Sequence, residues 1–450
     1  MADGFGPRLV TRHWGDDGAL TIDGYLERGG YASLRAALER QPDEIVELVK
    51  RSGLRGRGGA GFPTGVKWSF IPKDTGKPIY LACNADEGEP GTFKDRELME
   101  RDPHQLIEGI AIAAYAVGCH TAFIYMRGEF LEPGRRVERA VREAYERGFL
   151  GKGIAGSDFD LELVLHRGAG SYECGEETAL LESLEGRRGQ PRLRPPFPAV
   201  AGLYGAPTVI NNVETLSTVP HILRIGVDEY SKLGTEKSSG TKVFSVSGKV
   251  ERPGNYEVPM GTPARAIVED LAGGVRGGKA LKAWVPGGSS TPFLTADHLD
   301  LGMDFESISE AGSLLGTGAM IVLDEEDCIV DAVLRWTQFY AHESCGKCTP
   351  CREGTWWMTK VLYRMEHGGG RLDDIDMMLD VGDNILFKSL CALGDGAVSP
   401  ISSGIKHFRD EYVEHVKAGG CPRKDRPTLE AATPRSGGAA GTIPLGEVLP

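Results

Sequence analysis

Three cysteines, Cys345, Cys348 and Cys351, follow one another at intervals of two residues in the run Cys-Gly-Lys-Cys-Thr-Pro-Cys. Thiolates at this spacing can occupy three corners of one cubane iron–sulfur cluster. The fourth ligand is expected to be Cys391, which lies between two predicted helices. A four-cysteine zinc site and purely structural cysteines are the alternatives, but zinc sites more often use two separated pairs. The spacing therefore favours a [4Fe–4S] cluster and one-electron transfer.

A glycine-rich run precedes the first predicted strand and has the composition of a phosphate-binding loop. Without bulky side chains, consecutive backbone N–H groups can point at a phosphate. Nearby positive charge and flat rings would suit a nucleotide, although a flexible surface loop with ordinary core aromatics is the alternative. The pattern is neither a Walker A loop nor a dinucleotide fingerprint. The residues concerned are Gly56, Arg57, Gly58, Gly59, Ala60, Gly61, Phe62, Lys67 and Phe70, with Arg55 and Trp68 beside them.

Polar residues also follow predicted strands, at the sheet edge where α/β proteins bind ligands. One group after the first strand could accept hydrogen bonds from a ring or ribose, or could be a solvated acidic turn. A second group opens a helix, where acidic residues are stabilising without any function. Paired asparagines more often cap turns than bind cofactors. These groups are Asn84, Asp86, Glu87 and Glu89; Tyr172, Gly175, Glu176 and Glu177; and Asn211, Asn212 and Thr215.

The elements that must position these residues fall into three successive patterns. Residues 41–237 alternate strands with helices, which predicts an α/β domain with a largely parallel sheet. Its expected helices are 42–51, 106–117, 135–147 and 176–184, and its expected strands are 78–83, 121–127 and 161–166. Residues 238–330 indicate a small α+β module, with expected strands at 242–250, 255–258, 283–285 and 319–323 and a helix at 264–271. Residues 331–425 indicate a helical bundle, whose expected helices are 328–342, 355–367, 373–386 and 405–416. Residues 1–40 form an extension without strong periodicity, and residues 426–450 are expected to be a disordered tail.

The composition excludes several classes of protein. The 450 residues are 40% hydrophobic and 26% charged, as in ordinary globular proteins. A net charge of -13 disfavours nucleic-acid binding. No apolar run approaches the ~20 residues of a membrane span, and no secretory signal is expected. Nine cysteines, an odd number, indicate reduced thiols. Cys83, Cys119, Cys328 and Cys421 stand alone and are expected to be buried or free thiols.

Taken together and in this order, the motifs resemble one family closely, the flavin-containing NADH-oxidising subunit of respiratory complex I, which is the F subunit of the bacterial enzyme. The resemblance covers about residues 30–425. It implies a Rossmann-like domain for FMN and NADH, a β-grasp-like domain, and a helical bundle carrying one [4Fe–4S] cluster. The matching stretches are residues 55–68, 83–96, 168–186, 195–198, 207–215 and 344–354, with Cys391.

The resemblance also implies roles for individual residues. Gly56, Gly58 and Lys67 would lie on the phosphate side of FMN. The flavin ring and ribityl chain would meet Asn84, Asp86 and Glu87, and the pocket would be completed by Tyr172, Gly175, Asn211, Asn212 and Thr215. NADH would stack through Phe62, Phe70 and Phe197, with Glu89 near the nicotinamide amide and Glu177 toward the adenosine ribose. Arg194 stands where lysine is also expected, which keeps the charge.

The implied activity is hydride transfer from NADH to FMN, followed by one-electron transfer through the cluster to the iron–sulfur chain of complex I. No catalytic side chain is needed. The implied partners are a thioredoxin-like [2Fe–2S] subunit and a large multi-cluster subunit, on the cytoplasmic side of the inner membrane. Two alternatives remain: the diaphorase subunit of a soluble NAD-linked hydrogenase or formate dehydrogenase, and a non-enzymatic iron–sulfur scaffold.

Overall fold

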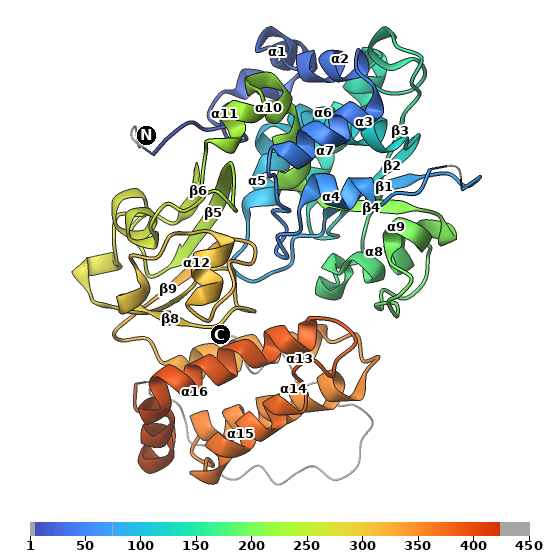
Figure 1. The fold of residues 1–450 in the computed structure, drawn as a ribbon. Helices are drawn as coiled ribbons and strands as arrows, with labels where there is room; N and C mark the ends of the chain where they lie inside the picture. Colours follow the sequence, from blue (N-terminus) through green and yellow to red (C-terminus); the bar gives the residue numbers. More distant parts are fainter. Residues whose placement is uncertain (1–4, 74, 424–450) are drawn as a thin grey trace.

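The computed structural model describes residues 5–73 and 75–423, which form two β-sheets and a helical bundle (Figure 1). The predicted disordered tail lies outside the described residues. The first sheet is parallel and has the order β3-β2-β1-β4. Its strands are β1 (Tyr80–Ala85), β2 (Thr121–Met126), β3 (Glu162–Arg167) and β4 (Thr208–Asn212).

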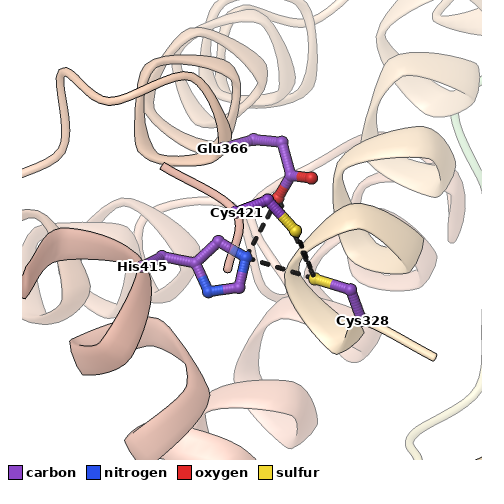
Figure 2. Close-up of side chains that lie close together, drawn as sticks. All are labelled: Cys328, Glu366, His415 and Cys421. Carbon is purple, nitrogen blue, oxygen red and sulfur yellow. Dashed lines mark hydrogen bonds and ion pairs between the residues drawn. The ribbon is translucent and has the colours of Figure 1, made fainter. Parts of the chain in front are cut away.

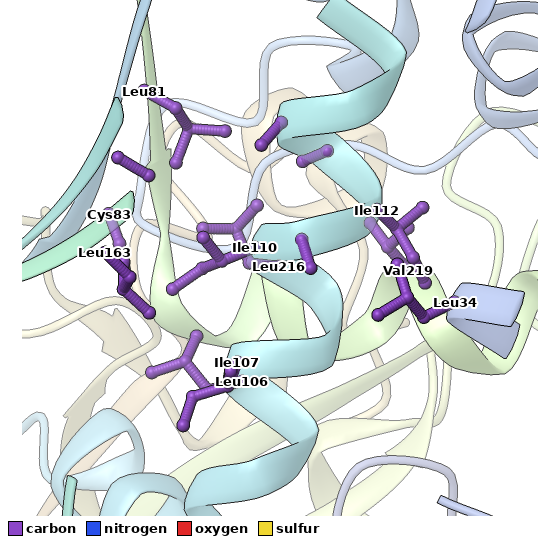
Figure 3. Packing of buried hydrophobic residues seen from close by; sticks show 14 of the residues in the cluster. Leu34, Leu81, Cys83, Leu106, Ile107, Ile110, Ile112, Leu163, Leu216 and Val219 are labelled. Carbon is purple, nitrogen blue, oxygen red and sulfur yellow. The ribbon is translucent and has the colours of Figure 1, made fainter. Parts of the chain in front are cut away.

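The helix α6 (Pro103–Val117) runs through the middle of the first domain and is buried on nearly every side. One face packs on the sheet through Ile107 and Ile110, near Leu81 and Cys83 (Figure 3). Its other faces meet α10 (Val213–Ile225) and α2 (Ala32–Leu38). Most residues of α6 are apolar and its His104, Gln105 and Glu108 are buried with hydrogen-bond partners, so this helix organises the core of the domain.

Further helices complete the first domain. They are α1 (Ile22–Glu27), α3 (Pro42–Arg51), α4 (Thr64–Ser69), α5 (Lys94–Arg101), α7 (Leu131–Glu146), α8 (Glu177–Leu184), α9 (Pro198–Ala201) and α11 (Val227–Ser231), with the 3₁₀ turns Asp17–Leu20, Ile154–Gly156, Tyr172–Gly175 and Leu203–Gly205. Residues 17–38, for which the sequence predicted no element, form helices whose apolar side chains join the same core.

The second sheet is mixed and has the order β6-β5-β9-β7-β8. Its strands are β5 (Thr241–Gly248), β6 (Gly254–Pro259), β7 (Leu281–Val285), β8 (Leu294–Thr295) and β9 (Ala319–Asp324). A helix expected at 264–271 is present as the π-helical turn Ala266–Leu271, and α12 (Phe305–Glu310) packs nearby. The strands expected in this module are therefore present.

The C-terminal bundle consists of α13 (Ile329–Glu343), α14 (Thr349–Glu366), α15 (Asp373–Asp383) and α16 (Leu393–Ala418). Its core is a separate apolar cluster that includes Val333, Leu362, Met378 and Ile401. The α16 helix begins twelve residues earlier than the sequence pattern predicts, because Pro400 and several glycines obscure its periodicity. The predicted fold class, a parallel α/β domain followed by a second sheet and a helical region, is confirmed.

Candidate functional site

The carboxyl ends of β1 and β4 lie side by side, with Asn84 opposite Asn212 in the register. In the order β3-β2-β1-β4, β2 and β3 follow β1 on one side of it, and β4 lies on its other side, so the strand order reverses between β1 and β4. Such a reversal opens a crevice at the carboxyl edge of a parallel sheet, where ligands bind. The sheet therefore brings the two predicted asparagine groups to the place where a cofactor is expected.

The glycine-rich loop lies against this edge. A Cβ atom added to Gly58 would stand 2.9 Å from the Cβ of Asn212, so the backbone comes closer than a side chain allows. Gly59 has a φ of +136°, which favours glycine. The Gly56 N–H donates to the Phe62 carbonyl at 2.8 Å, and the Arg57 N–H donates to Thr215 Oγ1 at 2.8 Å. These bonds fix a loop whose tip, at Gly58 and Ala60, is exposed.

The two arginines of the loop bind the second module. The Arg57 guanidinium is fully buried and donates to the Ser239 carbonyl at 2.7 Å. Arg55 forms an ion pair with Glu306 at 2.5 Å. A ligand at the loop tip would meet the backbone of Arg57, while its guanidinium anchors the loop from below. Arg57 therefore stays a predicted cofactor-binding residue through its backbone. The burial of its side chain argues against a contact between the guanidinium and the cofactor.

The three asparagines at the strand ends have different hydrogen-bond partners. Asn84 Nδ2 donates to the Gly175 carbonyl at 2.8 Å, which ties the end of β1 to the loop after β3. Asn211 Oδ1 accepts from Trp68 Nε1 at 2.8 Å, which ties β4 to α4. Asn212 Oδ1 accepts from the Glu214 N–H at 3.0 Å and caps α10. The asparagines thus hold the walls of the crevice together.

The three carboxylates after β1 are buried but differ in their surroundings. Glu87 accepts from the N–H groups of Asp95 and Arg96, at 2.7 and 3.0 Å, and caps α5. Glu89 accepts from Tyr172 Oη at 2.7 Å and from the Ser290 N–H at 2.8 Å. Within the described ranges, Asp86 receives no hydrogen bond at its carboxylate. Burial raises the pKa of Asp86 to about 7, against the opposing effect of Arg127.

A half-buried ion cluster and exposed aromatic rings lie on the α4–α8 side of the sheet edge. Lys67 of α4 lies 3.0 Å from Glu177 of α8, and Arg194 lies 3.3 Å from the same carboxylate. Glu176 caps α8 by accepting from Thr178 and Ala179. The rings of Phe62, Phe70 and Phe197 are 47%, 55% and 58% exposed, which is unusual for phenylalanine and suits ring stacking.

The predicted cluster ligands gather at one end of the bundle. Cys345 lies between α13 and α14, Cys348 caps the start of α14, Cys351 stands in the first turn of that helix, and Cys391 precedes α16. Cys351 and Cys391 belong to one buried cluster that Cys348 packs against. The Leu390 N–H donates to Cys348 Sγ at 3.5 Å, and Ser344 Oγ lies 3.2 Å from Cys351 Sγ. Burial raises the pKa of Cys351 to about 12.

The cysteine loop docks on the first domain. Gln190 Nε2 donates to the Cys345 carbonyl at 3.0 Å, and Lys347 Nζ donates to the Pro191 carbonyl at 2.6 Å. From the other side, the Tyr172 N–H donates to Glu343 at 3.0 Å. The loop after β3, which holds Asn84 through Gly175, therefore also contacts the end of α13 beside the cysteines.

Comparison with known proteins agrees with this architecture. Residues 49–221 match the Nuo51 FMN-binding domain, residues 243–294 the SLBB domain, and residues 331–415 the iron–sulfur binding region of NADH-ubiquinone oxidoreductase-F. The chain is 59% identical over 431 residues to the F subunit of NADH-quinone oxidoreductase in Mycobacterium tuberculosis, covering 94% of this chain and 97% of that one. The chain belongs to the family of NADH-quinone oxidoreductase F subunits.

Other relatives extend the comparison. The F subunit of the Streptomyces coelicolor enzyme is 58% identical, with 92% of each chain covered. Among solved structures, an NAD⁺-reducing [NiFe]-hydrogenase in the H₂-reduced state matches with a TM-score of 0.77 and 39% identity. That match covers 85% of this chain but only 64% of the hydrogenase chain. In the described part of the chain, no helix is both long and apolar enough to cross a membrane.

The residues present fit the two cofactors of this family, FMN and a [4Fe–4S] cluster. For FMN, the fit lies in the close approach of Gly58 to Asn212, which a Cβ atom would prevent, and in the exposed loop tip at Gly58 and Ala60. For the cluster, it lies in four neighbouring thiols with backbone and hydroxyl donors beside their sulfurs. The roles of individual residues toward FMN and NADH stay predictions.

A buried charge network beneath the crevice was not predicted. Lys94 pairs with Asp95 at 2.8 Å and with Glu214 at 2.9 Å, and Lys242 lies 3.3 Å from Glu214. Burial lowers the pKa of Lys242 to about 7. In the sequence, these residues look like ordinary solvated charges at helix and strand starts. Only their convergence in space shows that they support the floor of the site.

Proposed function

We propose that this chain oxidises NADH and passes the electrons onward as the F subunit of an NADH-quinone oxidoreductase. Bound FMN would supply hydride acceptance, and a bound [4Fe–4S] cluster would supply one-electron transfer. One observation carries the proposal: the loop after β3 contacts both sites. Its Gly175 carbonyl binds Asn84 in the crevice, and its Tyr172 N–H binds Glu343 beside the cysteine loop.

In this proposal, the side chains bind and orient the reactants. The backbone of the glycine loop holds the phosphate of the cofactor, and Asn84 and Asp86 face its ring. The exposed rings of Phe62 and Phe70 stack against the dinucleotide. Glu177, held by two cations, accepts hydrogen bonds from the adenosine ribose. No side chain has to act as a general acid or base.

The partners proposed for this chain are a thioredoxin-like [2Fe–2S] subunit and a large multi-cluster subunit. Together they would form a peripheral assembly on the cytoplasmic side of the membrane. The cysteine loop supports this arrangement, because Cys345 and Cys348 are only half-buried within the chain. A partner subunit could therefore approach the cluster closely.

The second candidate is the diaphorase subunit of an NAD-linked hydrogenase. The TM-score of 0.77 with the hydrogenase structure favours it. The coverage points the other way, since the chain spans 97% of the mycobacterial F subunit but 64% of the hydrogenase chain. We therefore prefer the quinone-linked function.

An anaerobic titration of the purified complex with NADH tests the proposal. We expect the flavin absorption band to bleach and the EPR signal of a reduced cluster to appear in the same titration. NADH-dependent reduction of an added quinone, with no electron supply from H₂ or formate, would separate the two candidates. A flavin band that NADH leaves unchanged would overturn the proposal and favour a non-enzymatic scaffold.

A further inference from the structure

Four potential metal ligands meet at the end of the bundle remote from the predicted cluster cysteines (Figure 2). They are Cys328, Glu366, His415 and Cys421, whose ligand atoms all lie within 4.8 Å of one another. Cys328, Glu366 and His415 are buried, and Cys421 is half-buried. In the sequence they are scattered over more than ninety residues, so the two cysteines appear isolated.

Three helices and one loop deliver these side chains. Cys328 caps the start of α13, Glu366 ends α14, His415 stands in the last turn of α16, and Cys421 follows α16. Backbone hydrogen bonds fix the approach of Cys421: its N–H donates to the Glu366 carbonyl at 3.0 Å, and the Gly420 N–H donates to the His415 carbonyl at 2.9 Å. The group is therefore assembled by the fold.

The separations between the ligand atoms match the edges of a tetrahedral zinc site. The Sγ atoms of Cys328 and Cys421 are 3.7 Å apart. Two thiolates bound tetrahedrally to one Zn²⁺, each at about 2.3 Å, would be about 3.8 Å apart. Cys328 Sγ lies 3.2 Å from His415 Nε2, against about 3.6 Å for a tetrahedral site with sulfur and nitrogen ligands.

The Glu366 carboxylate supplies the fourth ligand atom of the tetrahedral arrangement. Glu366 Oε2 lies 3.2 Å from His415 Nε2 and 3.9 Å from Cys328 Sγ. The corresponding tetrahedral edges are about 3.3 Å and about 3.5 Å. These four distances are within about 0.4 Å of the edges of a tetrahedral zinc site, and the ligand atoms of all four residues lie within 4.8 Å of one another.

The orientation of the histidine is suited to a metal. His415 Nδ1 lies 2.6 Å from the Glu411 carbonyl, which can only accept a hydrogen bond. Nδ1 must therefore carry a proton, and Nε2 is the ring nitrogen that faces Cys328 and Glu366. A histidine ligand is usually fixed in this way, by a hydrogen bond from its other ring nitrogen.

The start of α13 directs one backbone donor at Cys328, and this donor opposes the burial and the Glu366 carboxylate that raise the pKa of the thiol. The Asp331 N–H donates to Cys328 Sγ at 3.3 Å, so the sulfur receives a donor from the first turn of the helix. Beyond the cluster, Lys282 and Arg423 pair with Glu411 at 3.1 and 2.9 Å. Glu411 also accepts from the Ile329 N–H at 3.2 Å, so this carboxylate joins the two cations to the start of α13.

We propose that Cys328, Glu366, His415 and Cys421 bind one structural Zn²⁺ ion. Binding would release the protons of the two thiols, leaving two thiolates, a carboxylate and a neutral imidazole on the ion. Zinc suits this mixed set of sulfur, nitrogen and oxygen ligands, and four protein ligands leave no open position for catalysis. The ion would clamp the segment after α16 to the starting end of α13 and the final turn of α14.

This site is distinct from the predicted iron–sulfur site. The two groups lie at opposite ends of α13, whose 15 residues span about 22 Å. The match to the iron–sulfur binding region covers residues 331–415 and so leaves out Cys328 and Cys421. The proposal does not depend on NADH oxidation, because a zinc content can be measured without turnover.

Metal analysis of the full chain, purified without a metal-affinity tag, tests the proposal. We expect about one zinc per chain in the wild type, and a loss of at least about 80% of it in Cys328→Ala and Cys421→Ala. Iron and flavin contents should stay at wild-type levels in Cys421→Ala, because that residue lies after the last helix. Cys119→Ala, a buried cysteine that is remote in sequence from the four ligands, is the matched control and should retain zinc.

A second measurement covers the case in which a variant fails to fold. Co²⁺ exchanged into the wild-type chain should give the absorption bands of a tetrahedral thiolate complex, and these bands should be absent after Cys421→Ala. Zinc below about 0.1 per chain in wild type that has its full iron content would overturn the proposal. So would a Cys328–Cys421 disulfide in protein purified without oxygen, or full zinc in the Cys328→Ala/Cys421→Ala double variant.

Discussion

At the residue scale, neighbouring acidic residues of the same motif have different tasks. Asp86, Glu87 and Glu89 follow the same strand, and all three are buried. Glu87 caps α5 and Glu89 joins the first domain to Ser290 of the second module, whereas the Asp86 carboxylate accepts no hydrogen bond from the described residues. The sequence could predict that carboxylates gather at this sheet edge. It could not assign them, because their donors come from distant segments.

Asp86 should make stability depend on pH. Burial raises its pKa to about 7 from an ordinary value of 3.8, so between these pH values the folded chain keeps a proton that the unfolded chain releases. Its contribution to stability therefore decreases as pH rises from 4 to 7. Because an amide does not ionise, we expect the free energy of unfolding of Asp86→Asn, relative to that of wild type, to rise by roughly 3 kcal/mol between pH 5 and pH 8, and the Tm difference to rise with it.

Thermal unfolding of the purified chain, with flavin content recorded at each pH, provides this measurement. Asp300→Asn is the control, since Asp300 is exposed and Arg265 holds its pKa below the usual value. The Tm difference of that variant should not increase with pH. A flat Asp86→Asn difference would show that the Asp86 carboxyl is ionised throughout this range.

Glu177 should select against NADPH. Its carboxylate would repel the extra phosphate of NADPH, and its removal would free Lys67 and Arg194 to bind that phosphate. We expect Glu177→Ala to raise the ratio of kcat/KM for NADPH over NADH by roughly tenfold, equivalent to about 1.4 kcal/mol. Glu182→Ala, on the same helix but paired with Arg187 and Arg192, should leave the ratio unchanged. An unchanged ratio in Glu177→Ala removes that residue from cofactor selection.

At the element scale, the sequence predicted the elements whose apolar residues recur with a strong period. It missed elements of mixed polar and apolar composition. The prediction matched α3 at both ends, because its charged and apolar positions alternate cleanly and Gly53 follows it. The strand β4 was missed, since its Asn211 and Asn212 resemble a turn. The helix α10 was also missed, because Pro220 lies inside it and its polar first turn is buried against the charge network.

The crossing of α6 and α10 depends on one glycine. A Cβ atom on Gly109 would lie 2.0 Å from the Leu216 carbonyl oxygen, which is rigid backbone. We expect Gly109→Ala to destabilise the chain by roughly 3 kcal/mol or more, because two core helices must separate. Since α10 carries Thr215, which holds the glycine loop, flavin retention should fall as well.

Gly134 offers a matched control for this prediction. It is also a buried glycine within a helix, but its added Cβ would meet the guanidinium of Arg167, which can move. Gly134→Ala should therefore be neutral or stabilising by up to about 1 kcal/mol. Chemical denaturation and flavin content of both variants provide the comparison, and equal stability of the two would contradict the packing argument.

At the scale of the whole molecule, buried charges join the domains. Glu214 at the start of α10 binds Lys94 of the first domain, and Lys242 and the Val243 N–H of the second sheet. Removing its charge leaves two buried lysines with too few anions. We expect Glu214→Gln to cost about 3–5 kcal/mol of stability, whereas Glu97→Gln, which breaks an exposed pair with Arg101, should cost less than about 1 kcal/mol. Similar Tm values for the two variants would argue against a supporting role for the network.

The division of the chain into a hydride-accepting domain and an iron–sulfur bundle should be separable by mutation. Cys348 lies in the cysteine loop of the bundle, whereas the crevice residues all belong to the first domain. In the assembled complex, Cys348→Ser should oxidise NADH with a soluble dye at a rate within about twofold of the wild-type rate. Its rate of quinone reduction should be lower than that of wild type by roughly a hundredfold or more. The crevice does not need this thiol, but onward transfer does.

Thr349→Ala is the control for this last variant, because it changes the adjacent residue and keeps all four thiols. It should retain both activities. The Leu390 N–H donates to Cys348 Sγ and belongs to the same turn as Cys391. Cys348→Ser therefore removes one ligand and leaves this backbone donor in place. If dye reduction fell as far as quinone reduction in a folded Cys348→Ser complex, the two sites would depend on each other more closely than their separate domains imply.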